Sequence, residues 1–242
     1  MVANTVLADD LLFEVLAEKV RPTMPARLEP VEFKRGPGGR PSRAEAERRH
    51  AALLDTATRL FLERGLDAVS IDEIAKRSAV AKRFIYARYR DKSALFVAAI
   101  EQWIGDRLDV LQTFAPPPER AEIGLVKFGQ KLLDIGLQPD ALALQRLLFV
   151  AAPRFPELAE HFIARNRHRA ASEIERVLGF YGRRGEIELN DSQAMAEQFF
   201  IAVVGIPQRL ALLGLREPPA KERRRLRTAV RLFLDGCRPR QL

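Results

Sequence analysis

The chain has 242 residues, a formal net charge of +8, and 47% hydrophobic residues. This length and composition suffice for one large or two small domains with a buried core. The single cysteine, Cys237, excludes an intrachain disulfide framework, so we expect a reducing compartment and assign the protein to the cytoplasm. No apolar run approaches the roughly 20 residues that a membrane-spanning helix needs, so no membrane partner is expected.

Positive charge is concentrated in two segments of the chain. Residues 34–92 contain 15 basic and 8 acidic residues, and residues 221–242 contain 8 basic and 2 acidic residues. Such segments are typical of proteins that bind polyanions, although a solvated basic surface gives the same count. Charge alone therefore leaves nucleic-acid binding open.

Nearly every apolar pattern in the sequence has the helical period, and no run alternates strictly, so the predicted fold class is all-α. Residues 1–39 are expected to form a flexible N-terminal extension and basic arm, because prolines and the stretch "KRGPGGRP" (Lys34 to Pro41) oppose regular structure. An amphipathic helix is predicted from Arg43 to Arg64. Gly65 then stands where a left-handed cap is expected.

Two short helices separated by a tight turn are predicted next. Ser70 and Glu73 form a capping-box pattern for a helix from Ile71 to Arg77, and a second short helix is predicted from Lys82 to Tyr89. Asp91 is the expected cap of a long helix. Two short helices across a turn, held between long helices, form a helix-turn-helix arrangement. Prolines and glycines delimit the remaining predicted helices, at about 119–136, 140–151, 157–183, 191–213 and 219–235.

The second short helix has both apolar residues that can anchor it and long polar residues that can contact DNA, as a recognition helix requires. Phe84, Ile85 and Tyr89 can anchor it to the domain, while long side chains remain to contact DNA. In a recognition helix some residues reach base edges and others bind phosphate oxygens. The candidate donors are Lys82, Arg83, Tyr86 and Arg88, and for each basic residue both kinds of contact are open.

The stretch "LLDTATRLFLERGLDAVSIDEIAKRSAVAKRFIYARYRDKSALF" resembles, without a gap, the DNA-binding domain of the tetracycline-repressor (TetR) family. The resemblance implies that Ser70 contacts phosphate at a helix start, that the Tyr86 hydroxyl meets the DNA backbone, and that Lys92 binds phosphate. Arg40 could reach the minor groove, or it could belong to a linker. The complete expected DNA-binding set is Arg40, Ser70, Lys82, Arg83, Phe84, Tyr86, Arg88, Tyr89 and Lys92.

The sequence departs from the family pattern at several positions. Ala79 stands where the family usually has glycine, so a left-handed conformation there would either cost about 1 kcal/mol or be avoided by a different turn. Ala81 replaces a common serine and removes a possible helix cap. Arg83 and Phe84 replace a frequent Gly-Thr pair, and Arg88 replaces a frequent histidine. These changes predict a DNA readout that depends more on arginine than is usual.

The resemblance implies a DNA-binding domain at residues 47–107 and an effector-binding and dimerisation domain at residues 118–237. The predicted helix 191–213 is apolar on more than one face, so it could pack with the last helix against a second copy, or within its own chain only. An effector pocket would be lined by apolar and aromatic side chains. The candidates are Trp103, Phe128, Phe149, Phe162 and Phe199, each of which could instead be plain core.

No catalytic or metal-binding pattern is found. The sequence lacks GxSxG, HExxH, a Gly-rich phosphate loop and a cysteine pair, so we expect no enzyme activity and no cofactor. His161 and His168 lack a third ligand, so no metal is expected. The function expected is a homodimeric regulator, a repressor, that binds a palindromic operator in double-stranded DNA and is released by an unknown, largely apolar small molecule. The alternatives are an architectural DNA binder without an effector, and an all-α enzyme or lipid-binding protein.

Overall fold

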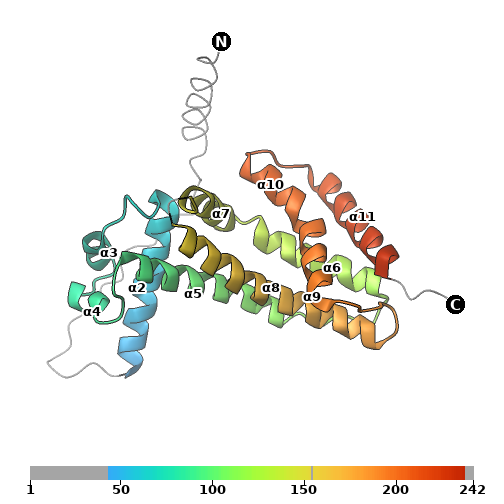
Figure 1. Ribbon diagram of the computed structural model, residues 1–242, viewed down its shortest axis with the longest axis horizontal. Coiled ribbons are helices and arrows are strands. Elements are labelled where there is room, and N and C mark those ends of the chain that lie inside the picture. The colour runs from blue at the N-terminus through green and yellow to red at the C-terminus, as the bar shows by residue number, and fades with distance from the viewer. Residues whose placement is uncertain (1–42, 154, 238–242) are drawn as a thin grey trace, which may run out of the picture.

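The computed structural model describes residues 43–153 and 155–237, and every regular element in these ranges is a helix (Figure 1). Within α8 the side chains of residues 157–159, 161 and 163–168 are also outside the description. The predictions made for residues 1–39 and for Arg40 lie outside the described residues. The predicted all-α class is confirmed. The helices are α2 (Arg43–Arg64), α3 (Ile71–Arg77), α4 (Lys82–Tyr86), α5 (Lys92–Gln112), α6 (Ala121–Gly136), α7 (Pro139–Ala151), α8 (Pro156–Arg183), α9 (Ser192–Phe200), η1 (Ile201–Gly205), α10 (Ile206–Leu212) and α11 (Pro219–Cys237).

The N-terminal part of the fold is built on α2, which crosses α5 and packs against it, with α3 and α4 beside them (Figure 1). Their apolar stripes meet in one core that includes the fully buried Phe61, Ile74, Ile85 and Phe96. Gly65 ends α2 with a φ of +81°, as the sequence predicts. This core fixes the orientation of the two short helices.

The C-terminal part has a second core, formed by α6, α8, α9, η1 and α11. Phe128, Tyr181, Phe199 and Val230 are each buried in it. The Tyr181 hydroxyl donates a hydrogen bond of 3.0 Å to the carbonyl of Pro117, so the largest buried side chain has its polar atom satisfied. The C-terminal part thus has an apolar core of its own.

The two parts share side chains across their boundary. Phe162 of α8 is buried in the N-terminal core, where its ring meets Phe96 edge to face at a centroid distance of 5.6 Å. Arg107 of α5 lies over the Trp103 ring at 3.7 Å and forms an ion pair with Asp140 of α7. Arg169 of α8 also pairs with Asp109 of α5 at 3.0 Å. Apolar packing and ion pairs therefore join α5 to both α7 and α8.

The prediction of one continuous helix at 191–213 is wrong. The chain there divides into α9, the π-helical turn η1 and α10, with Pro207 in the first turn of α10. Inside an uninterrupted α-helix, Pro207 would lack its N–H and its ring would clash with the carbonyl of Val203. A wider turn before the proline and a fresh helix start avoid both problems. The other predicted C-terminal helices begin and end within a few residues of those observed.

Candidate DNA-binding interface

Helix α3 begins as its capping pattern predicts, but only half of the capping box forms. The Ser70 hydroxyl accepts a hydrogen bond of 3.2 Å from the backbone N–H of Glu73. The Glu73 carboxylate does not return to the cap, because it accepts from Arg64 at 2.6 Å and Arg77 at 2.9 Å. Ser70 is exposed at the start of the helix, and its hydroxyl proton can still be donated.

The turn after α3 places Ala79 in the left-handed region, with a φ of 54°. The N–H of Val80 donates to the carbonyl of Ala75 at 3.1 Å, and that of Ala79 to Lys76 at 3.4 Å, so the helix ends in a Schellman motif. This motif requires positive φ at the position that Ala79 occupies, a position glycine normally fills. Of the two alternatives open from the sequence at Ala79, the strained left-handed conformation is the one observed.

Helix α4 is shorter than predicted. It ends at Tyr86 instead of Tyr89, because the N–H groups of Arg88 and Tyr89 both donate to the carbonyl of Ile85 and close the chain into a turn. Ile85 is fully buried and fixes the helix to the N-terminal core. Ala81 precedes α4 with no side-chain cap hydrogen bond, as expected for a residue without a hydroxyl.

Two side chains of α4 are free to contact DNA. Tyr86 is 56% exposed, and Arg83 is exposed and has no side-chain hydrogen bond or ion pair in the described part of the chain. They are three residues apart, so they lie on one face of the helix. Lys82 is also exposed, but its ammonium pairs with Asp72 of α3 and must leave that partner to contact DNA.

Arg88 and Phe84 form a unit. The Arg88 guanidinium lies over the Phe84 ring at 3.8 Å from its centroid, and one of its nitrogens donates to the Phe84 carbonyl at 3.4 Å. Phe84 is half-buried against the N-terminal core, so its ring supports the guanidinium from below. Arg88 is therefore an oriented charge next to α4.

Tyr89 is held within the chain by a residue that sequence reasoning missed. Its hydroxyl and Nε2 of His50 on α2 are 2.5 Å apart. Burial raises the pKa of Tyr89, whereas burial and, second, the charge of Arg88 lower the pKa of His50. The pair is thus neutral near pH 7, and it joins the turn that follows α4 to α2. No local pattern could reveal a partner 39 residues away in the sequence.

Lys92 lies at the start of α5, beside the loop that leads into α3. Its ammonium donates to the carbonyl of Val69 at 3.0 Å and to that of Asp67 at 3.4 Å. An ammonium group has three donors, so one proton remains for an anion near Ser70. Asp91 caps α5 as predicted, accepting from the N–H of Ala94 at 2.8 Å.

The five aromatic residues expected to line an effector pocket lie in three different places. Phe128 and Phe199 are buried in the C-terminal core, and Phe162 is buried in the N-terminal core. Trp103 packs at the edge of that same core, and Phe149 is 65% exposed at the end of α7. The structure does not bring these five rings together around one cavity.

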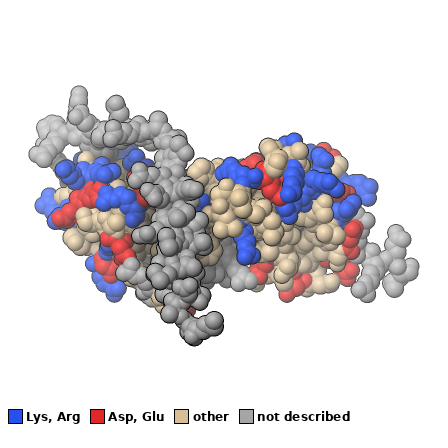
Figure 2. All heavy atoms as spheres, turned by 90° about the horizontal axis from the view of Figure 1, so that it is seen from above, with Lys and Arg blue, Asp and Glu red and all other residues tan. Residues whose placement is uncertain are grey.

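Lys and Arg side chains gather over the helix-turn-helix end and again over the other end of the molecule (Figure 2). Among the described residues, no group of three or more His, Cys, Asp or Glu side chains could hold a metal ion. None of the described helices combines the length and the apolar character that a bilayer crossing requires.

Comparison with known proteins identifies both parts of the chain. A family model described as "Bacterial regulatory proteins, tetR family" matches residues 53–99, and one described as "AefR-like transcriptional repressor, C-terminal domain" matches residues 124–236. Among curated proteins, the chain is 40% identical over 71 residues to YdeS of Bacillus subtilis, an uncharacterized HTH-type transcriptional regulator. That match covers 29% of this chain and 36% of YdeS.

A second curated relative is the HTH-type transcriptional activator FasR of Mycolicibacterium smegmatis. It is 34% identical over 73 residues, which cover 29% of this chain and 33% of FasR. The chain thus matches only about a third of the length of these two relatives.

Solved structures extend the likeness to most of the chain. A TetR-family regulator of Mesorhizobium loti superposes with a TM-score of 0.73 at 23% identity, covering 80% of this chain and 98% of that one. The flavonoid-responsive regulator FrrA superposes with a TM-score of 0.62 at 28% identity, covering 81% and 100%. The two family models match the helix-turn-helix part and the C-terminal part in turn, and the structure has the fold of the family. The chain therefore belongs to the TetR family of DNA-binding transcriptional regulators, and it is not an enzyme.

Proposed function

We propose that the protein is a homodimeric repressor that binds a palindromic operator and is released when a largely apolar small molecule binds its C-terminal half. The observation that carries the DNA-binding part is that Arg83 and Tyr86 are exposed on one face of α4 and have no side-chain hydrogen bond or ion pair among the described residues. Lys92 and Ser70, at the starts of α5 and α3, add two further candidate phosphate contacts. The family description of the C-terminal part as that of a repressor favours repression over activation. Since the partner is chromosomal DNA, we place the protein in the cytoplasm.

Exposed apolar side chains support dimerisation through the last helices. Ile201 of η1 is 60% exposed, Ile206 of α10 is 47% exposed, and Leu232 of α11 is 64% exposed. Apolar surface of this kind gains free energy when a second copy covers it. A two-fold dimer would place the recognition helices about one turn of DNA, roughly 34 Å, apart, as palindromic half-sites require.

The effector is proposed to be apolar and aromatic. FrrA is named as flavonoid-responsive and is similar to this chain over most of its length, so a flat aromatic ligand is the first class to test. A ligand that binds between helices of the C-terminal half acts on DNA only by favouring one arrangement of the two parts. Phe162 against Phe96, and Asp140 paired with Arg107, are contacts through which α7 and α8 would move α5.

The proposal is tested first by selecting bound sequences from a random double-stranded DNA pool. A palindrome should be enriched by the natural protein and lost with Arg83→Ala, while the matched control Arg183→Ala, an exposed arginine in the last turn of α8, should keep it. Flavonoids are then titrated against the operator complex. Trp103 is the only tryptophan in the chain, so its fluorescence reports movement at the contact between α5 and α7.

Different results would lead to different conclusions. Binding that is uniform over all sequences and strongly salt-dependent would favour the architectural alternative, because phosphate contacts alone read no sequence. A selected palindrome whose affinity no apolar ligand changes would keep the DNA-binding part and remove the effector. A monomer in sedimentation at operator-binding concentrations would remove the dimer.

A further inference from the structure

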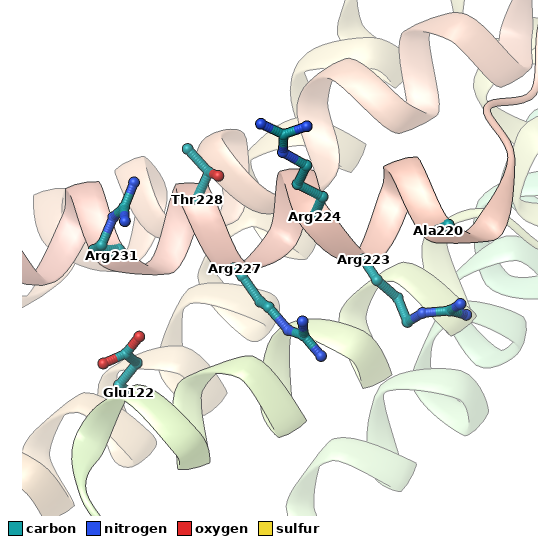
Figure 3. Close-up of a pocket in the computed structure, with 7 residues that line it drawn as sticks. All are labelled: Glu122, Ala220, Arg223, Arg224, Arg227, Thr228 and Arg231. Atoms are coloured by element: carbon teal, nitrogen blue, oxygen red, sulfur yellow. The ribbon is translucent and has the colours of Figure 1, made fainter.

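A basic pocket lies at the end of the molecule away from the helix-turn-helix. It has a volume of about 590 Å³ and is lined by α11 and by Glu122 of α6. Arg223 and Arg227 extend from α11 toward α6, and Glu122 rises from α6 toward α11 (Figure 3). The complete lining is Glu122, Ala220, Arg223, Arg224, Arg227, Thr228 and Arg231.

Four of the seven lining residues are arginines, and one is acidic. Arg223, Arg227 and Arg231 follow one another at intervals of four residues, so their α-carbons rise about 6 Å per step along one side of the helix. Like charges at this spacing destabilise a helix.

The carboxylate of Glu217, just before α11, is used by other basic residues. Glu217 accepts from Arg225 at 2.7 and 2.9 Å and pairs with Lys221 at 3.0 Å, and these charges lower its pKa to about 2. The four pocket arginines, listed above, have no side-chain hydrogen bond or ion pair in the described part of the chain. Lys221 and Arg225 are therefore paired, whereas the pocket keeps four unpaired guanidinium groups, of which those of Arg223 and Arg227 extend toward α6 (Figure 3).

We propose that this pocket binds a small molecule that carries two or more adjacent phosphate groups. Guanidinium groups bind phosphate through paired hydrogen bonds, and a row of them matches a chain of phosphates better than a single anion. The volume lies within the range of small-molecule sites. The Glu122 carboxylate repels phosphate, so it sets the end of the phosphate chain and accepts from a hydroxyl or amino group beyond it.

The site is distinct from the apolar effector site proposed above and does not depend on operator binding. Two ligands in one protein, one apolar and one polyphosphorylated, would let the regulator respond to two signals. The arginines also could hold a DNA backbone, but the concave, ligand-sized shape favours a small molecule. The experiment below makes DNA one of its outcomes.

The test is calorimetric titration of the purified full chain with inorganic tripolyphosphate and with ADP, at near-physiological salt and without divalent cations. Saturable binding of one molecule per chain is expected. Arg227→Gln should weaken the affinity for both probes about tenfold or more, because it removes charge-assisted hydrogen bonds. Glu122→Gln should strengthen the affinity for tripolyphosphate, because it removes a repelling charge. Arg183→Gln, which makes the same change of net charge outside the pocket, should leave both affinities unchanged.

Three outcomes would overturn the proposal. Absence of saturable binding of either probe would remove the site. An equal loss of affinity in Arg183→Gln and Arg227→Gln would mean that net charge, not the pocket, holds the anions. Weaker binding of non-operator DNA by Arg227→Gln with unchanged probe affinity would assign the arginines to DNA. Circular dichroism of each variant separates these results from misfolding.

Discussion

Ala79→Gly is expected to stabilise the protein. Ala79 has a φ of 54°, and it occupies the position of the Schellman motif at which glycine is normally found. A left-handed conformation costs a residue with a Cβ about 1–2 kcal/mol, and glycine does not bear this cost. Ala79 is exposed, so the substitution removes no buried contact.

The gain is reduced by the unfolded state, in which glycine is more flexible than alanine. That difference is about 0.4–1 kcal/mol. The net increase in the free energy of unfolding should therefore be about 1 kcal/mol, which corresponds to a rise in Tm of roughly 2–4 °C for a chain of this size. In urea, the midpoint should rise while the slope stays constant, because the surface exposed on unfolding does not change.

Ala87→Gly provides the matched control. Ala87 is also exposed in the helix-turn-helix, but its φ of −67° and ψ of −18° suit alanine, so glycine there should lower stability by about 0.5–1 kcal/mol. The two substitutions thus have the same chemistry and opposite expected signs. If Ala79→Gly destabilised the protein as much as Ala87→Gly does, the strain assigned to the turn would be refuted.

Three further predictions concern packing, pH and DNA. Gly124→Ala should lower the free energy of unfolding by about 1–3 kcal/mol, because its Cβ would lie 1.7 Å from the Tyr181 hydroxyl oxygen. Gly236→Ala should raise it, because nothing lies within 4 Å of the added Cβ and alanine favours the helix. Urea unfolding of the two variants compares these effects. The lowered pKa of His50 means that the folded protein binds fewer protons than the unfolded chain as pH falls. The contribution of His50 to the free energy of unfolding should therefore be complete above the ordinary pKa of 6.5 and decrease as the pH falls below it. In His50→Gln the free energy of unfolding should decrease less between about pH 7.5 and 5.5 than in the natural protein. An equal decrease in both proteins would contradict this role of His50. Tyr86→Phe should weaken DNA binding several-fold and equally for operator and unrelated DNA, measured by fluorescence anisotropy; a change confined to the operator would mean that Tyr86 contacts a base.

The helices could be predicted because the signals that start and end them are local. Ser70 and Asp91 cap α3 and α5 through their own side chains, and Gly65 ends α2 with a positive φ. The interruption at η1 could not be predicted in this way, because the apolar pattern continues through it. Pro207 breaks the helix by its effect on a carbonyl four residues earlier, inside that otherwise strong helical pattern. Sequence periodicity shows which residues are apolar, not whether the helix between them is continuous.

The contacts of the site could be predicted only in part. The exposed positions of Arg83 and Tyr86 follow from the helix period, but the partners of their neighbours do not. Lys82 meets Asp72, and Tyr89 meets His50, through the three-dimensional packing of separate helices. Position in the sequence alone does not show which aromatic side chains share a pocket. Phe162 is an example, because the fold buries it in the core of the helix-turn-helix part.

The π-helical turn η1 affects which side of α10 faces outward. A π-turn contains one residue more than the α-helical path, and each added residue rotates all later side chains by about 100°. Deleting the exposed Ala202 would exchange the outward-facing Ile206 for a neighbouring residue, while α9 would stay as it is. Loss or gain of a single residue at η1 could therefore give related proteins different association surfaces on the same core, with no substitution on α10 itself.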